Sequence, residues 1–333
     1  MNYRILQKGD ENGNGMVVKF RLPSGLEILG LPTKNFYGGH WDLGPTWNYA
    51  VMADEPFLVD AGRYGQGKNL LDMMKIAGIA PDDLNFVLIS HGHEDHILYN
   101  FLFPDAQLWV HALDAGVFRD MDVFIHQFFP ADEMDEETKT VWTQLLNEVI
   151  KYRPKEPDRL LEDEEILDFG HTRVQVLHTP GHTAGHLSFH FIDEGVIFLA
   201  DLDLVKFGPY YGDNASSIDD TIKSLERLSK IDADVYLVSH GKDAILDGDP
   251  AHIQRYIDVI YQRDEKLLAY LASGPKTLQE ITAHGIIYGG HTLANGAWDL
   301  SRSEKSMMRK HLDRLGRMGS VKNENGIYKL NGQ

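Results

Sequence analysis

The chain contains no cysteine among its 333 residues. This absence excludes disulfide bonds and thiolate ligands, so any metal site here must be built from nitrogen and oxygen donors. Long apolar runs are missing too. No stretch reaches the roughly 18 consecutive apolar residues typical of a membrane-spanning helix, and residues 1–10 carry no apolar signal region. We therefore expect a cytoplasmic protein without a membrane segment.

Basic residues are scarce: 32 Lys and Arg stand against 50 Asp and Glu, which gives a net charge of −18. The charge is unevenly spread, because residues 255–333 contain 12 basic and 8 acidic residues and are net positive. An acidic body repels polyanions, so we do not expect nucleic acid as the main partner. The change of charge near residue 250 also indicates a boundary between two parts of the chain.

The most informative stretch is residues 90–96, Ser-His-Gly-His-Glu-Asp-His. It places three imidazoles and a carboxylate directly after the apolar residues 85–89, a run typical of a short buried strand. Strand ends are a usual place for a rigid scaffold to present ligands, and a neutral imidazole can bind a metal. The first histidine pair could serve one metal and the following Asp-His pair a second. The alternative, a solvated polar loop, is disfavoured by residues further along the chain.

Four more apolar runs are followed by side chains of the kind that bind metals. Asp60, Asp201 and His240 each come directly after such a run, and His182 lies in the loop after a fourth. Packing alone does not explain why five strand-like segments should all lead into a histidine or an aspartate. We therefore expect these residues to lie together at one site in the folded protein.

With these residues in this order, the chain resembles the metallo-β-lactamase superfamily between about residues 16 and 245. The resemblance implies an α/β fold, a four-layer αββα sandwich with a two-metal site at the edge of its sheets. Asp60 matches the position that supports such a site by fixing a ligand or a loop. The resemblance implies His91, His93 and His182 as ligands of one metal. It implies Asp95, His96 and His240 as ligands of the other, with Asp201 bridging the two.

The implied cofactor is a pair of divalent metal ions. Imidazole and carboxylate ligands suit zinc, iron and manganese, and we expect zinc, with iron or manganese as alternatives. Asp201 is similar to the bridging ligand of the glyoxalase II type of centre. His93 stands where oxygen-reducing diiron relatives usually have glutamate, and no flavin-type tail is present, so we expect hydrolysis rather than redox chemistry.

A hydroxide bridging two metals could attack a carbonyl or phosphoryl centre at neutral pH, with Asp95 as both a ligand and its catalytic orienting group. We expect hydrolysis of a small, anionic acyl substrate, a thioester or an ester or lactone. One alternative is an endoribonuclease or phosphodiesterase, because the same metals act on phosphodiesters and residues 305–317 are rich in Lys and Arg. Another is a non-enzymatic metal-binding protein on the same fold.

Substrate contacts must come from residues outside the ligand set. Arg63, Lys206 and Lys242 follow the metal motifs closely and are candidate contacts for a substrate anion. Tyr210 or Tyr211 could donate a hydrogen bond to a developing oxyanion. For each of them the alternative is an ordinary solvated or structural side chain.

The motifs divide the chain into a catalytic domain, residues 1–250, and a smaller C-terminal domain, residues 251–333. Residues 118–158 interrupt the strands and predict a helical insertion near the cleft. The helix expected after the acid-rich residues 132–137 of this insertion should bury an apolar stripe that includes Val141 and Leu145. Phe124, Phe128 and Phe129 either line the pocket or pack the insertion onto the core.

Beyond residue 250 the sequence predicts helices over residues 253–271 and 303–315, with a capping box at Thr277 and Glu280 opening a helix between them. Asn325-Gly326 predicts a hairpin within residues 321–330. This order resembles the winged-helix tail of one branch of the superfamily, which includes an endoribonuclease. The physiological substrate stays open, and a homodimer formed through the tail or the insertion is an alternative to a monomer.

Overall fold

The computed structural model of the protein describes residues 2–11, 13–33, 45–62, 70–97, 100–128, 134–150, 152–289 and 300–332. Two β-sheets form its centre. The first has eight strands in sequence order. Its strands are β1 (Asn2–Gln7), β2 (Val17–Arg21), β3 (Glu27–Thr33), β4 (Thr46–Met52), β5 (Phe57–Val59), β6 (Phe86–Leu88), β7 (Gln107–His111) and β8 (Arg159–Leu161).

The first five of these strands pair antiparallel, and β5 to β8 run parallel to one another. The second sheet has six strands in the order β14-β13-β12-β11-β10-β9, and only β12 and β13 pair in parallel. Its strands are β9 (Ile166–Asp168), β10 (Arg173–His178), β11 (Leu187–Phe191), β12 (Val196–Phe198), β13 (Val235–Leu237) and β14 (Ile245–Asp247).

The two sheets pack face to face through a shared apolar core. Successive side chains of a strand point to opposite faces of its sheet. In β4, Trp47, Tyr49 and Val51 therefore enter the core between the sheets, while Ala50 faces the helices on the outer side of the first sheet. The rings of Phe57 and Phe169 stack across it with centroids 4.2 Å apart. Each sheet therefore buries one face against the other and needs helices to cover its second face.

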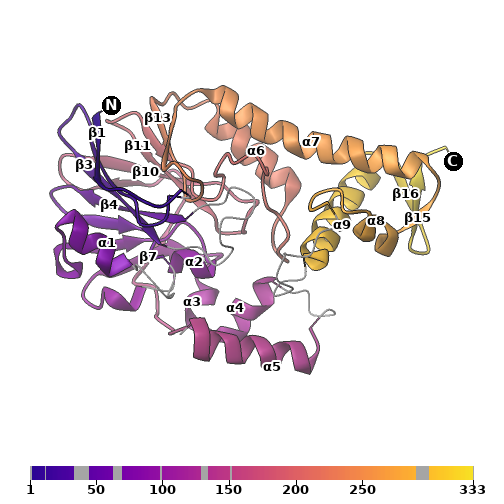
Figure 1. Ribbon diagram of the computed structural model, residues 1–333, viewed down its shortest axis with the longest axis horizontal. Coiled ribbons are helices and arrows are strands. Elements are labelled where there is room, and N and C mark those ends of the chain that lie inside the picture. Colours follow the sequence, from indigo (N-terminus) through magenta and orange to yellow (C-terminus); the bar gives the residue numbers. More distant parts are fainter. Residues whose placement is uncertain are drawn as a thin grey trace.

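Helices supply that cover and complete four layers, αββα, as the sequence resemblance implied (Figure 1). The outer face of the first sheet is covered by α1 (Leu70–Ala77), α2 (Glu94–Ile97), α3 (Gly116–Arg119) and α4 (Met121–Phe128). The outer face of the second is covered by α6 (Ile218–Leu228) and the first half of α7 (Pro250–Ala272). Short 3-10 turns lie at Pro81–Asp83 and Asn100–Leu102.

The insertion contains α4, α5 (Glu136–Gln144) and a π-helical turn at Leu145–Ile150. Asp135 caps α5 by accepting a hydrogen bond from the Thr138 amide at 2.8 Å. Phe124 is fully buried in the core under the first sheet, whereas Phe129 lies outside the described residues. Leu145 packs against the core as expected, and so does the adjoining Leu146, but the expected stripe is wrong at Val141, which is 58 % exposed, because Trp142 turns inward in its place.

The C-terminal elements follow the predicted order. They are the end of α7, β15 (Lys276–Thr277), α8 (Leu278–His284), α9 (Ser301–Arg317), β16 (Val321–Glu324) and β17 (Ile327–Leu330). Thr277 and Glu280 form the predicted capping box, and positive φ angles at Asn325 and Gly326 make the predicted hairpin turn. The three short strands pair antiparallel in the order β15-β17-β16.

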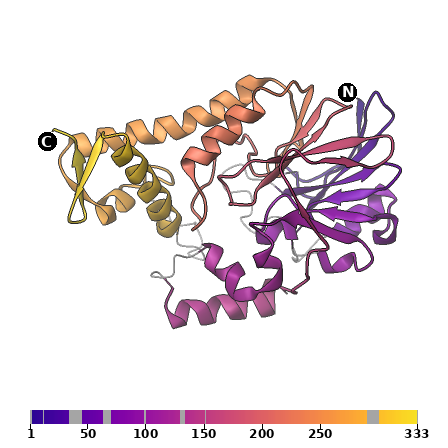
Figure 2. The same cartoon turned by 180° about the vertical axis from the view of Figure 1, so that it is seen from behind.

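Helix α7 connects these elements to the sandwich. Its early residues Ile253, Tyr256 and Ile257 pack on the second sheet, while Leu267 and Leu271 belong to the separate core of the C-terminal region. Figures 1 and 2 show the helix extending from the sandwich to the C-terminal elements, with α9 near α4 in both views. Within the described ranges, every helix is too short or too polar to span a lipid bilayer.

One buried hydroxyl joins the two sheets and allows a test of the packing. The Tyr49 hydroxyl in β4 lies 2.8 Å from the carbonyl oxygens of both Val238 and Ala244, which flank the loop after β13. Tyr49→Phe is expected to lower the free energy of unfolding by about 1–2 kcal/mol, because buried carbonyls lose their donor. Urea unfolding measures the change.

The matched control is Tyr3→Phe, since Tyr3 is 60 % exposed on the edge strand β1. It is expected to stay within about 0.5 kcal/mol of the unsubstituted protein. Equal unfolding curves for Tyr49→Phe and the unsubstituted protein would show that this bond does not hold the sheets together.

Candidate metal centre and cleft

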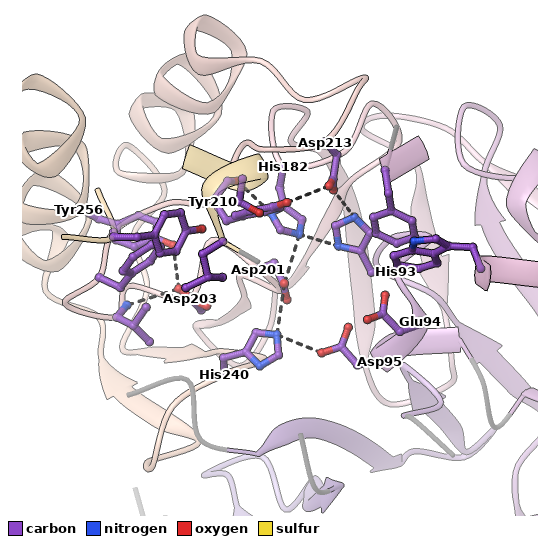
Figure 3. A pocket seen from close by; sticks show the side chains of 18 residues that line it. His93, Glu94, Asp95, His182, Asp201, Asp203, Tyr210, Asp213, His240 and Tyr256 are labelled. Atoms are coloured by element: carbon purple, nitrogen blue, oxygen red, sulfur yellow. Dashed lines mark hydrogen bonds and ion pairs between the residues drawn. The ribbon is translucent and has the colours of Figure 1, made fainter. Parts of the chain in front are cut away.

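The seven residues implied as metal ligands lie together at one edge of the sandwich, where several strands end. The loop after β6 carries His91 and His93, α2 carries Asp95 and His96, the β10–β11 loop carries His182, and Asp201 and His240 follow β12 and β13. All seven residues are buried, none more than 9 % exposed. Figure 3 shows five of them gathered around a common space.

Three histidines and a carboxylate form the first group. Nδ1 of His93 lies 3.1 Å from Nε2 of His91 and 2.9 Å from Nε2 of His182. Oδ2 of Asp201 lies 3.2 Å from Nε2 of His182 and 3.8 Å from Nε2 of His91. Each residue thus presents one donor atom to the same point, all within 4.8 Å of one another.

The second group consists of Asp95, His96 and His240. Nε2 of His96 and Nε2 of His240 each lie 3.5 Å from an oxygen of Asp95. Asp201 also contacts this group, because its two oxygens lie 3.2 Å from Nε2 of His96 and 3.2 Å from Nε2 of His240. Asp201 is therefore the residue shared by both groups.

These separations fit divalent ions. A tetrahedral ion with metal–ligand bonds of about 2.0–2.1 Å has donor atoms about 3.3 Å apart. Nε2 of His96 and Oδ1 of Asp201 are buried and have no hydrogen-bond partner in the part of the chain that is described. Buried polar atoms rarely lack a partner, and a cation bound between these two atoms would satisfy both. The nitrogen and oxygen donors suit zinc, iron and manganese alike.

Charges in the site favour a bound cation. Burial raises the pKa of Asp201, but the imidazoles of His240 and His96 outweigh it and hold that pKa well below its usual range. Burial lowers the pKa of His240, and the carboxylates of Asp201 and Asp95 more than reverse this, to about 9. Protons and metal ions therefore compete for His240, so metal binding should release protons and weaken as the pH falls.

Asp60 lies where the sequence interpretation expects a supporting group. It is fully buried, accepts hydrogen bonds from the Ser90 amide at 2.7 Å and the Ser90 hydroxyl at 2.8 Å, and faces Nδ1 of His96 at 2.9 Å. Donation from Nδ1 to this carboxylate leaves the Nε2 lone pair of His96 directed into the site. Asp60 thus orients one imidazole and fixes the start of the histidine loop.

Asp213 is a supporting residue that the sequence analysis missed. Its Oδ2 lies 2.6 Å from Nε2 of His93, and the Tyr210 hydroxyl donates to its Oδ1 at 3.0 Å. Asp213 therefore does for His93 what Asp60 does for His96. It lies in an irregular segment, with no strand end to mark it, so only the tertiary structure reveals the contact.

Asp114 is a second residue that was missed. It accepts hydrogen bonds from the Gly92 amide at 2.9 Å, the Gly185 amide at 2.7 Å and the Thr183 hydroxyl at 2.7 Å. A Cβ at Gly185 would lie 2.5 Å from Oδ1 of Asp114, so glycine is needed there. Asp114 ties the loop of His91 to the loop of His182, and its place shortly after the apolar residues 108–110, which lie in β7, was the available signal.

A cavity of about 180 Å³ adjoins the metal-type residues (Figure 3). Three parts of the chain line it: the metal loops with residues 203–213, the insertion through Phe128 and Trp142, and the C-terminal region through Tyr288, Leu300 and Ser303. The insertion near the cleft was predicted. The contribution of the C-terminal region was not.

Among the predicted substrate contacts that the structure describes, Tyr210 alone lines the cavity. Tyr211 was a wrong choice, because it is fully buried and its hydroxyl bonds to Nε2 of His311 at 2.7 Å and to Arg263. Lys206 and Lys242 are exposed and are not among the residues that line the cavity. Arg63 lies outside the described residues.

Three basic residues of α9 contact other parts of the protein. Lys310 donates to the carbonyl oxygen of Asp213 at 2.5 Å and to that of Ser216 at 2.6 Å. Arg317 pairs with Asp219 at 2.6 Å, and Arg314 pairs with the same carboxylate and with Asp264. These contacts hold α9 against the 213–219 segment. Arg314 is buried by them, whereas the side chain of Arg317 stays 63 % exposed.

Comparison with known proteins places this architecture in a family. The profile described as the metallo-beta-lactamase superfamily matches residues 41–240. The chain therefore belongs to the metallo-β-lactamase superfamily.

Two solved structures share the fold over nearly the whole chain. A metallo-beta-lactamase family protein from Thermus thermophilus has a TM-score of 0.68 at 24 % identity, covering 91 % of this chain and 98 % of that one. A beta-lactamase domain protein from Burkholderia ambifaria has a TM-score of 0.68 at 18 % identity, covering 94 % of each. Since residues 251–333 are about a quarter of this chain, both matches must include most of the C-terminal region.

Similarity to curated proteins is more local. A hydroxyacylglutathione hydrolase of Rhizobium etli is 48 % identical over 44 residues, which is 13 % of this chain and 17 % of that protein. An uncharacterised protein of Mycobacterium tuberculosis is 27 % identical over 168 residues, 46 % of this chain and 66 % of the other. The chain thus matches about a sixth of the length of the hydrolase.

The two orienting carboxylates provide a test of the centre. Asp60→Asn and Asp213→Asn are each expected to weaken metal binding by about 10- to 100-fold, because an amide holds the imidazole less firmly and makes it less basic. Competition with a chromophoric chelator measures the affinity for zinc.

Asp82→Asn is the matched control, since Asp82 is exposed on a 3-10 turn away from the site. Its zinc affinity should equal that of the unsubstituted protein. If both site variants also bind zinc as tightly as the unsubstituted protein, these carboxylates do not support a metal centre.

Proposed function

We propose that this protein is a metal-dependent hydrolase that cleaves small acyl substrates, thioesters or esters including lactones. The observation that carries the proposal is the pair of buried donor groups sharing Asp201 beside an internal cavity. His91, His93 and His182 would hold one ion, and Asp95, His96 and His240 the other, with Asp201 contributing to both. We expect zinc, with iron or manganese as the ions to test beside it.

Bound ions would supply Lewis acidity for a substrate carbonyl and lower the pKa of water, so the reaction needs no nucleophilic serine or cysteine. The protein's own residues fix the geometry. Asp95 lines the cavity, and its Oδ2 accepts a hydrogen bond from the Thr46 hydroxyl at 2.9 Å. We assign Asp95 the acceptance of the proton from the attacking water. Burial raises the pKa of Asp95, but the imidazoles of His96 and His240 hold it below the usual value, so the carboxylate is ionised near neutral pH.

The short stretch of identity with hydroxyacylglutathione hydrolases supports thioesters as the first substrates to test. A phosphodiesterase is the weaker alternative, because Lys310, Arg314 and Arg317 bind protein groups rather than lining a path for a polyanion. We further propose that residues 251–333 form a winged-helix-like unit, supported by their helices and three-stranded sheet. The cytoplasmic location and a homodimer stay predictions.

A substrate panel tests the function. The protein, loaded separately with zinc, iron(II) or manganese(II), is assayed on thioesters, aryl esters, lactones and RNA. We expect at least one acyl class to be hydrolysed, with activity lost on metal removal and restored by metal. Asp201→Ala should lower kcat/KM by at least about 100- to 1000-fold, because both donor groups lose their shared ligand.

The exposed variant Asp82→Asn is the control for preparation and should keep full activity. Unchanged hydrolysis after complete metal removal would contradict the proposal. Cleavage of RNA without cleavage of any acyl substrate would favour the phosphodiesterase. A protein that takes up no metal in metal-replete medium would favour a non-catalytic role.

A further inference from the structure

An aromatic stack from the insertion forms one wall of the cavity. The Phe128 ring stacks on His93 with centroids 5.5 Å apart, and the Trp142 ring stacks on Phe128, also at 5.5 Å. All three side chains line the cavity. The stack therefore begins at a residue of the metal centre and continues outward as an apolar surface.

A second apolar wall joins the segment after Asp201 to the C-terminal region. Phe207 and Tyr288 pack with ring centroids 5.2 Å apart, and Leu300 lines the same cavity. Arg263 of α7 is 3 % exposed, donates to the carbonyl oxygen of Phe207 at 2.6 Å and lies 5.1 Å above its ring. This buried contact fixes the wall to the helix that carries the C-terminal region.

Apart from the histidines of the metal centre, the charged side chains among the described lining residues are all acidic. The lining side chains that the structure describes include no Lys or Arg, but they do include Glu94, Asp95, Asp201, Asp203 and Asp213. Two divalent ions would bring four positive charges against these five carboxylates, so bound metal leaves no positive excess. A carboxylate on the acyl group would be buried here without a cationic partner, which is strongly unfavourable.

The size of the cavity limits the group that it accepts. Its volume is about 180 Å³. A dry cavity of about 150 Å³ lined by apolar side chains is known to bind benzene. A phenyl ring or a chain of about six carbons therefore fills the space. When the acyl group occupies the cavity, no room is left there for the alcohol or thiol part of the substrate, which must lie outside it.

We propose that this cavity binds an uncharged, apolar acyl group about the size of a phenyl ring or a six-carbon chain, between the aromatic stack of the insertion and a wall supplied in part by the C-terminal region. The proposal rests on the proposed acyl hydrolysis and names its substrate class. It differs from the expected anionic acyl group, because the described residues that line the cavity include no Lys or Arg.

The first test compares N-acetylcysteamine thioesters that share a leaving group and differ only in the acyl group. Hexanoyl and phenylacetyl thioesters should show kcat/KM at least tenfold above that of the succinyl thioester. Val205→Lys, which places a cation among the lining residues, should move the preference towards succinyl by at least tenfold. Equal or better turnover of the succinyl thioester by the unsubstituted protein would overturn the proposal.

The second test measures binding without turnover. Hexanamide and phenylacetamide are titrated into the metal-loaded protein by calorimetry, with succinamate as the anionic comparison. Trp142→Ala and Leu300→Ala, one from each wall, should each weaken binding of the neutral amides about tenfold. Val141→Ala is the control, because Val141 precedes Trp142 but is 58 % exposed.

The two tests separate this proposal from the function on which it rests. If no thioester is hydrolysed but phenylacetamide binds and depends on Trp142 and Leu300, the cavity assignment stands and the hydrolase proposal fails. If thioesters are hydrolysed but neither wall variant changes binding or acyl preference, the hydrolase proposal stands and the cavity assignment fails. Circular dichroism of each variant confirms that it is folded.

Discussion

The shared carboxylate of Asp201 is the constraint on which the rest of the site depends. It lies within 3.2 Å of His96, His182 and His240, which come from three separate parts of the chain. Two buried carboxylates among five buried imidazoles need positive charge beside them, which either protons on the histidines or bound cations supply. The site forms only where five parts of the chain meet at one edge of the sandwich. They are the ends of β6, β12 and β13, the loop after β10 and the short helix α2.

The sequence predicted the fold class and the convergence of these residues because both depend on local signals. An apolar run followed directly by a histidine or aspartate marks a strand end, and Asp60, Asp201 and His240 all lie at such positions. Asp213 has no such signal, since its contact with His93 spans 120 positions of the chain and depends on tertiary packing. Tyr211 was misjudged because closeness in sequence to a metal ligand does not say which way a side chain points, and its hydroxyl turns away to His311.

The C-terminal region is part of the site as well as an appendage to the sandwich. Helix α9 holds the segment that carries Asp213 through Lys310, and His311 bonds the neighbouring Tyr211. Tyr288 and Leu300 line the cavity itself. Its helices were predictable from their spacing and caps, but its role in the cleft depends on how α7 carries it back towards the insertion.

The most direct test of this account is an anomalous diffraction measurement on crystals of the metal-loaded protein. The account predicts two anomalous peaks for each chain, one among His91, His93 and His182 and the other among Asp95, His96 and His240, with Asp201 between them. Peaks only at surface sites, or none at this edge of the sandwich under metal-replete conditions, would contradict it.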